Sequence, residues 1–236
     1  WQMIFIFLAL YSLFCWYVFT FKIPELMLKT PTGVNLRALV KNYWIVLSNR
    51  HNGRLTALHL NLFSALTGAV YFAYLTNSAL IFGQIFAMSA LSFCLIFAAG
   101  GLSMLMGSFV ASQLLKTPPP MQLMWHSNLL QVAAALWLFL LASFSVAGVV
   151  EVIAGVCICL FAGGATRPTA AGVYMTYFDD NSGAAASLQT TLLFLLGALI
   201  GGLAALASQG ELAPIFAVML GSSLAARGVL GYIRRA

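Results

Sequence analysis

The residues best suited to bind a ligand are polar and aromatic side chains that interrupt long apolar runs. Where they recur every three or four positions, they share one face of a helix. The clearest faces lie in the runs over 56–77 and 184–207. Polar groups in hydrocarbon need partners or a water-filled cavity, so we predict a substrate cavity; alternatively, the small and hydroxyl residues only let helices pack closely. The predicted lining residues are Asn61, Ser64, Thr67, Tyr71, Ser92, Gln189, Thr190 and Phe194.

Charged residues near these runs are few. Glu151 begins the run over 149–174 and is the only acidic residue near the membrane interior. Its carboxylate either stabilises a helix N-terminus through the macrodipole or forms a proton or cation site that faces the cavity. Arg167 lies near the other end of the same run. We expect it to anchor the helix at the cytoplasmic surface or to pair with Asp179 or Asp180; contact with the substrate is the alternative.

The sequence offers little for enzymatic chemistry. It contains no Ser-His-Asp set, no HExxH, no P-loop and no glycine-rich nucleotide fingerprint. All four cysteines fall inside apolar runs, which favours buried apolar residues over disulfides or a zinc site. His59 and His126 each lack a second ligand at metal spacing. We therefore expect no enzyme, no cofactor and no metal.

The composition points to an all-α polytopic membrane protein. The chain of 236 residues is 62% hydrophobic and only 7% charged, whereas about a quarter of the residues in a soluble domain are charged. About 20 apolar residues cross the hydrocarbon core. Seven runs reach that length, at 2–21, 56–77, 84–112, 122–144, 149–174, 184–207 and 212–232. From their polar faces we expect the second, third, fifth and sixth runs to form interior walls, and the others to face lipid or serve as scaffold.

Basic residues set the expected orientation. If each run crosses once, all eleven Lys and Arg residues lie on one side of the membrane, which the positive-inside rule makes cytoplasmic. The C-terminus is then cytoplasmic, and Tyr74 lies in the outer aromatic belt. The net charge of +6 indicates contact with anionic lipid rather than with nucleic acid. Residues 22–55 are predicted to be a cytoplasmic linker whose middle forms an amphipathic helix on the membrane surface.

Several short motifs resemble the carboxyl-terminal portion of a major facilitator superfamily transporter, most closely of the Bcr/CflA-type drug efflux branch. They are WQMIF and IPE within 1–25, FAYLTNS at 72–78, GS followed by LLK within 107–116, and NSGAAASL at 181–188. The resemblance implies that 1–21 is the last helix of the amino-terminal half and that 56–236 is the six-helix carboxyl-terminal half. It also implies a location in the bacterial inner membrane.

The resemblance further implies proton-coupled export of small, mostly hydrophobic or cationic drugs and antibiotics by alternating access. The partners are then protons, the bilayer and the missing amino-terminal half, since the chain begins with Trp1 without an initiator Met. Two departures are notable: Ser112-Gln113 stands where the superfamily often repeats an Asp-Arg gating motif, and the first five helices, with their acidic coupling residue, are not present. The alternatives are a sugar or nucleoside transporter of the same superfamily and a seven-helix receptor or sensor.

Overall fold

The fold consists of helices throughout the part of the chain that the structure describes. This computed structural model describes residues 2–22, 36–48, 56–114, 119–178 and 181–235. Seven of the described helices are long and apolar enough to cross a membrane, which confirms the predicted all-α polytopic fold. The helices are α1 (Gln2–Lys22), α2 (Leu36–Ser48), α3 (Thr56–Ser78), the π-helical η1 (Ala79–Ile85), α4 (Ala90–Leu114), α5 (Pro120–Ser143), α6 (Val149–Met175), α7 (Ser182–Ser208) and α8 (Leu212–Arg235).

The chain divides into two compact units, residues 1–36 and 37–236. The first unit contains α1, whose described side chains are almost all exposed. The second contains α2 and the bundle from α3 to α8. Helix α2 lies where the sequence predicts a helix within the linker; the flanking linker residues, 23–35 and 49–55, lie outside the described part. Helix α2 contacts the bundle through Val46, which is buried, and through Tyr43, whose hydroxyl lies 2.8 Å from the Ser187 hydroxyl of α7.

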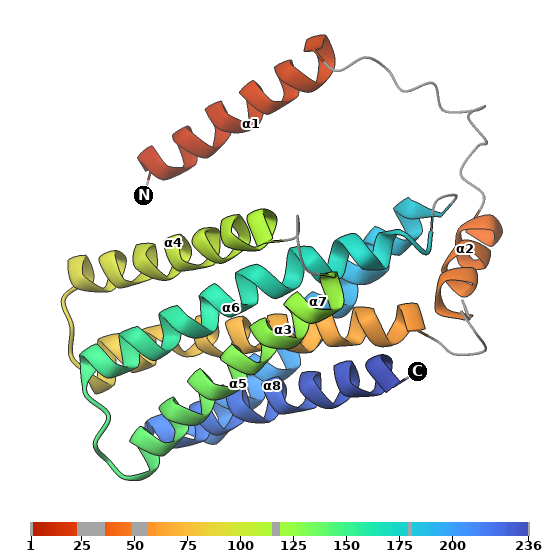
Figure 1. The fold of residues 1–236 in the computed structure, drawn as a ribbon. Helices are drawn as coiled ribbons and strands as arrows, with labels where there is room; N and C mark the ends of the chain where they lie inside the picture. The colour runs from red at the N-terminus through yellow and green to blue at the C-terminus, as the bar shows by residue number, and fades with distance from the viewer. Residues whose placement is uncertain (1, 23–35, 49–55, 115–118, 179–180, 236) are drawn as a thin grey trace. The chain divides into compact units, whose positions relative to one another are not determined.

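Helix α3 lies at the centre of the bundle and packs against α6, α7 and α8 (Figure 1). Helix α4 packs on α6, and α5 packs on both α6 and α8. The boundaries agree with the prediction except after α3, where the helix continues through η1 to Ile85 and α4 begins only at Ala90. The chain turns between them at Ala87, whose φ of 47° ends the helical path.

Local sequence signals explain several helix ends. Helix α5 begins at Pro120, where a missing N–H costs nothing because the first amides of a helix have no intrahelical partner. Helix α6 follows the extended Gly148 and has Glu151 in its first turn, where a carboxylate is favoured by the macrodipole. Helix α7 ends at Gln209 and Gly210, which have φ values of 42° and 90°.

A layer of polar side chains separates the bundle core into two apolar clusters. On α3, one cluster includes Leu60 and Phe63 and the other includes Val70 and Tyr74. The helices α5, α6 and α8 show the same order, with apolar residues of one cluster, then polar ones, then apolar residues of the other. The buried polar residues between the clusters are Asn61, Ser64, Thr67, Ser127, Asn128, Gln131, Thr166, Thr169, Ser222 and Ser223.

Hydrogen bonds between helices satisfy part of this polar layer. The Ser222 hydroxyl of α8 donates to the Leu66 carbonyl of α3 at 2.9 Å. The Gln131 amide of α5 donates to the Thr67 carbonyl of α3 at 3.2 Å. Such bonds hold helices together where lipid supplies no hydrophobic driving force.

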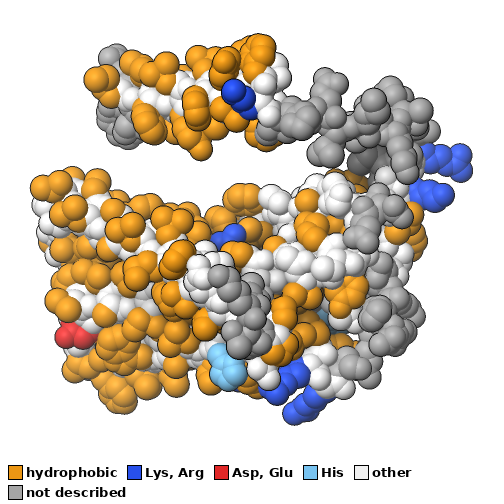
Figure 2. Space-filling view, turned by 45° about the horizontal axis from the view of Figure 1, so that its top comes forward, with side chains coloured by type: hydrophobic (Ala, Val, Ile, Leu, Met, Phe, Trp, Pro, Cys, Tyr) orange, Lys and Arg blue, Asp and Glu red, His pale blue; other side chains and the backbone are white. Residues whose placement is uncertain are grey.

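The exposure of α4 and α7 differs from the prediction. Both were expected to be interior walls, yet they are the least buried of the six bundle helices. Each buries a stripe of mostly small residues and leaves a broad apolar face exposed. Figure 2 shows that apolar side chains cover much of the face of the molecule in view. A stripe of small residues reveals which face packs but not what covers the rest. The exposed apolar residues on these two helices include Leu91, Leu95, Leu102, Leu105, Met106, Phe109, Phe194, Leu195, Leu199, Leu203 and Leu206.

Candidate functional site: a cavity around Arg167

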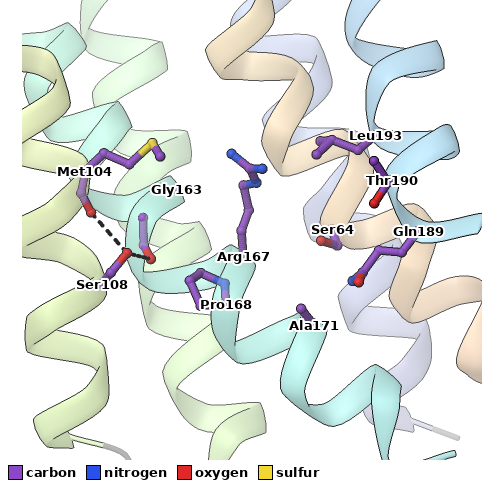
Figure 3. Close-up of a pocket in the computed structure, with 11 residues that line it drawn as sticks. Ser64, Met104, Ser108, Gly163, Arg167, Pro168, Ala171, Gln189, Thr190 and Leu193 are labelled. Atoms are coloured by element: carbon purple, nitrogen blue, oxygen red, sulfur yellow. Dashed lines mark hydrogen bonds between the residues drawn. The ribbon is translucent and has the colours of Figure 1, made fainter. Parts of the chain in front are cut away.

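A cavity of about 310 Å³ opens between α3, α4, α6 and α7 at the level of the polar layer. We name it the Arg167 cavity. In Figure 3 the Arg167 side chain extends from α6 into the space between α4 on one side and α3 and α7 on the other. The volume of the cavity lies at the lower end of the range for small-molecule sites. The lining residues are Ser64, Met104, Ser108, Gly163, Gly164, Arg167, Pro168, Ala171, Gln189, Thr190 and Leu193.

Arg167 lies well before the end of α6, the helix that it was predicted to anchor. Helix α6 has 27 residues, so it is about 40 Å long, and the hydrocarbon core is about 30 Å thick. Arg167 precedes the last residue of the helix, Met175, by about 12 Å at 1.5 Å per residue. With the helix centred in the bilayer, the Cα atom of Arg167 therefore lies within the hydrocarbon layer, on the cavity side of the helix.

Pro168 interrupts the hydrogen bonding of α6 beside this arginine. Proline has no N–H, so the carbonyl four residues earlier, that of Gly164, loses its helical donor. The Ser108 hydroxyl of α4 replaces that donor and lies 2.8 Å from the Gly164 oxygen (Figure 3). The same hydroxyl also lies 3.2 Å from the Met104 carbonyl of its own helix. The break in α6 is thus satisfied by a side chain from the opposite wall of the cavity.

Glycines let α4 and α6 approach each other closely at this break. A Cβ atom on Gly164 would meet the backbone of Met104, and one on Gly107 would meet the Phe161 carbonyl. Because these neighbours are backbone atoms, they cannot rotate away. The close approach brings Ser108 within hydrogen-bonding distance of α6.

Arg167 has no ion pair or hydrogen bond to any described residue. The acidic residues of the described part are Glu151 and Glu211, both near the opposite end of the bundle. Glu151 is on the same helix, about 24 Å away along its axis. The predicted pairing with Asp179 or Asp180 concerns residues outside the described part. Within that part, the half-buried guanidinium is a cation without a counter-charge.

Further polar atoms near the cavity also have no partner among the described residues. The Gln189 amide nitrogen, on the α7 side of the cavity, is buried and unbonded. The Ser64 hydroxyl, on the α3 side, makes no hydrogen bond to the described residues. A smaller pocket adjoins on the α5 side and is lined by Thr67, Tyr71, Gln131 and Arg167 among others. The Gln131 side-chain oxygen there is buried without a donor.

The structure brings together five of the eight predicted lining residues. Ser64, Gln189 and Thr190 line the Arg167 cavity, and Thr67 and Tyr71 line the adjoining pocket.

The other three predicted lining residues lie elsewhere. Asn61 is fully buried in the polar layer and does not line either space. Ser92 bonds to Ser89 at the start of α4, and Phe194 is exposed on α7, where its ring packs on Phe72.

Glu151 and Tyr74 also lie away from the cavity. The Glu151 carboxylate is exposed and turns toward Gly148 at the N-terminus of its own helix, as the macrodipole interpretation predicts. Tyr74 is only 2% exposed and packs on Phe82, so its predicted place in an outer aromatic belt is wrong. Of the four cysteines, only Cys159 is buried, whereas Cys94 is exposed.

The sequence interpretation gave Arg167 a role in the site only as an alternative, and it did not include Ser108 or Gln131. A signal for Arg167 was present: an Arg-Pro pair follows the small residues 162–165 well inside a span, where a charge is costly. Ser108 and Gln131 gave no comparable signal, because a serine or glutamine in an apolar helix is common at packing contacts.

Comparison of the chain with known proteins identifies no related protein or family. No protein-family model and no curated protein matches the chain. The resemblance to the major facilitator superfamily therefore remains a prediction from the sequence motifs.

Proposed function

We infer that this chain forms part of a proton-coupled secondary transporter of the major facilitator type, which exports small, largely apolar compounds by alternating access. The observation that carries this inference is the Arg167 cavity, where four helices meet at the level of the polar layer beside Pro168, which leaves one carbonyl of α6 without its helical donor. Transporters commonly place substrate sites near the bilayer midplane.

The chemistry of the lining suits an amphipathic solute. Met104, Pro168, Ala171 and Leu193 give the cavity apolar walls, and a few convergent polar groups would fix the orientation of a bound molecule. A purely structural helix contact would instead be expected to exclude a cation such as Arg167, because a charge within the membrane is costly and is usually functional.

The exposed apolar faces of α4 and α7 support a role for the bundle as one half of a larger assembly. These helices form two of the cavity walls, so a second helical bundle packed there would close the cavity. In this proposal the second bundle is the amino-terminal half of the same protein and carries the proton-coupling acidic residue. The C-terminus then faces the cytoplasm of a bacterial cell.

Dye accumulation in a drug-sensitive bacterium tests the proposal. Cells that express the intact protein should accumulate less of a neutral lipophilic naphthylamine dye than cells without it, and a protonophore should abolish the difference. The variant Thr190→Trp fills the cavity and should raise accumulation to the level of cells without the protein. The control Leu136→Trp changes a residue of α5 that is 43% accessible and lies outside the cavity and outside the exposed faces of α4 and α7, and it should export normally. Equal accumulation with and without folded protein would reject export of this dye class.

A further inference from the structure

We propose that the Arg167 cavity binds the carboxylate of an organic anion, so that the compounds carried are amphipathic acids. This inference rests on the proposed transport function and specifies its substrate class. It starts from the guanidinium of Arg167, which has no ion pair or hydrogen bond to any described residue and borders both the main cavity and the adjoining pocket. An arginine offers five N–H donors in a fixed fork whose spacing matches a carboxylate.

Neighbouring donors complete the site. The Gln189 amide nitrogen and the Ser64 hydroxyl lie across the cavity from Arg167 and make no hydrogen bond to described residues (Figure 3). A carboxylate has about four lone-pair sites, which is enough acceptor capacity for three such groups. Of the three, the Gln189 nitrogen is buried without a partner among the described residues, and a bound carboxylate would give it an acceptor.

The apolar lining residues and the charge of Arg167 disfavour cationic ligands and fully polar ligands. Met104, Leu193 and Pro168 offer apolar surface for a hydrocarbon or aromatic body. A cationic ligand would be repelled by Arg167 in a low-dielectric environment, and no acidic residue of the described part lies near enough to offset that repulsion. The favoured ligand is therefore a small apolar acid rather than a lipophilic cation or a sugar.

Equilibrium binding to the purified intact protein in lipid nanodiscs tests this proposal without a proton gradient. The probes are naphthalene carboxylate and naphthalene carboxamide, which share shape and size but differ in charge at neutral pH. Hydrogen bonds to a charged group are typically worth enough to change an affinity by about tenfold or more. We expect the carboxylate to bind at least about tenfold more tightly than the carboxamide.

Variants assign that preference to the cavity. Arg167→Gln should remove the preference, and Gln189→Leu should weaken carboxylate binding several-fold. The matched control Arg235→Gln removes an exposed cation at the end of α8 and should leave the preference intact. If Arg167→Gln does not fold, Arg167→Lys replaces it, with the expectation of a reduced but measurable preference because the charge stays and the fork is lost.

Several outcomes would overturn the proposal. Equal affinities of the two probes for the wild-type protein would show that Arg167 is held by a carboxylate of the protein itself or is otherwise not available to ligands. An undiminished preference in Arg167→Gln, or in both Arg167→Lys and Gln189→Leu, would place the anion elsewhere. Selective binding without protonophore-sensitive export of either the dye or naphthalene carboxylate would reject the transport proposal alone, and export of the dye without selectivity for the carboxylate would reject the anion site alone.

Discussion

Replacing Arg167 with glutamine should make the folded protein more stable. The substitution removes a positive charge from the interior of the bundle while keeping a polar side chain that can still reach the cavity. Among the described residues no counter-charge is lost with it, because Arg167 has no ion pair there. The change therefore relieves a desolvation penalty without breaking an interaction, which is the opposite of the usual effect of changing a buried residue.

The size of the effect follows from the surroundings of the guanidinium. Full transfer of an ion from water into a dry protein interior has an ideal cost of about 20 kcal/mol, and the effective cost in proteins is about several kcal/mol. Arg167 is only half-buried and borders a cavity of about 310 Å³, which is roomy enough for water. We therefore expect only about 1–2 kcal/mol of that penalty to remain. At about 2–4 °C per kcal/mol for a chain of this length, the apparent midpoint should rise by about 2–8 °C.

Thermal unfolding of the purified protein at a fixed scan rate and fixed detergent measures this shift, since membrane proteins rarely unfold reversibly. Arg235→Gln is the control and should leave the midpoint unchanged, because Arg235 is exposed. A fall of the midpoint for Arg167→Gln would refute the reasoning. Breaking a buried ion pair by removing one partner costs about 3–5 kcal/mol, so such a fall would show that Arg167 is paired in the folded protein.

Three further predictions concern packing and orientation. Gly164→Ala places a methyl group against the backbone of α4 and should destabilise the protein by about 1–3 kcal/mol in a denaturation assay, whereas Gly101→Ala meets open space and should not. Ser108→Ala removes the donor to the Gly164 carbonyl and should lower the unfolding free energy by about 1 kcal/mol. Ser112→Ala is its control, because the Ser112 hydroxyl bonds only within α4 among the described residues. Equal effects of the two substitutions would contradict the bridging role of Ser108. Ser145→Cys, in a background without native cysteines, should react with a membrane-impermeant maleimide added to intact cells, and protection until lysis would reverse the proposed orientation.

The helices themselves were predictable because long apolar runs have only one stable form in a bilayer. Within lipid every backbone group must bond inside its own segment or barrel, so a run of sufficient length is a helix. The exception after α3 is instructive: the sequence around Asn77 and Ser78 looks like a loop, yet the helix continues through η1. Both side chains are buried and bond to backbone carbonyls, Asn77 to that of Ala73 and Ser78 to that of Leu75. Tertiary contacts therefore override the local polar signal.

The candidate site was only partly predictable, because helical periodicity identifies a face but not a depth or a neighbour. Ser64, Thr67 and Tyr71 follow from the stripe on α3, and Gln189 and Thr190 follow from that on α7. The stripe also includes Asn61, which the structure buries in the polar layer instead. Two residues one turn apart on the same face can thus lie in the core and in the cavity, respectively. Which of them lines the cavity depends on how the neighbouring helices pack.

Arg167 shows where counting charges at span ends gives an incomplete account. A rule that assigns each arginine to a cytoplasmic terminus predicts a topology, because most arginines of this chain lie near or between the ends of the apolar runs. The rule does not cover an arginine in the interior of a helix, such as Arg167, beyond which α6 extends in both directions. Such a residue lowers the stability of the protein unless an anion compensates its charge. Its position beside Pro168, at a cavity where Gln189 and Ser64 also have donors without partners among the described residues, favours a ligand as the source of that compensation. The lower stability of the protein without a bound anion and the proposed anion site are thus two consequences of the same charge, that of Arg167.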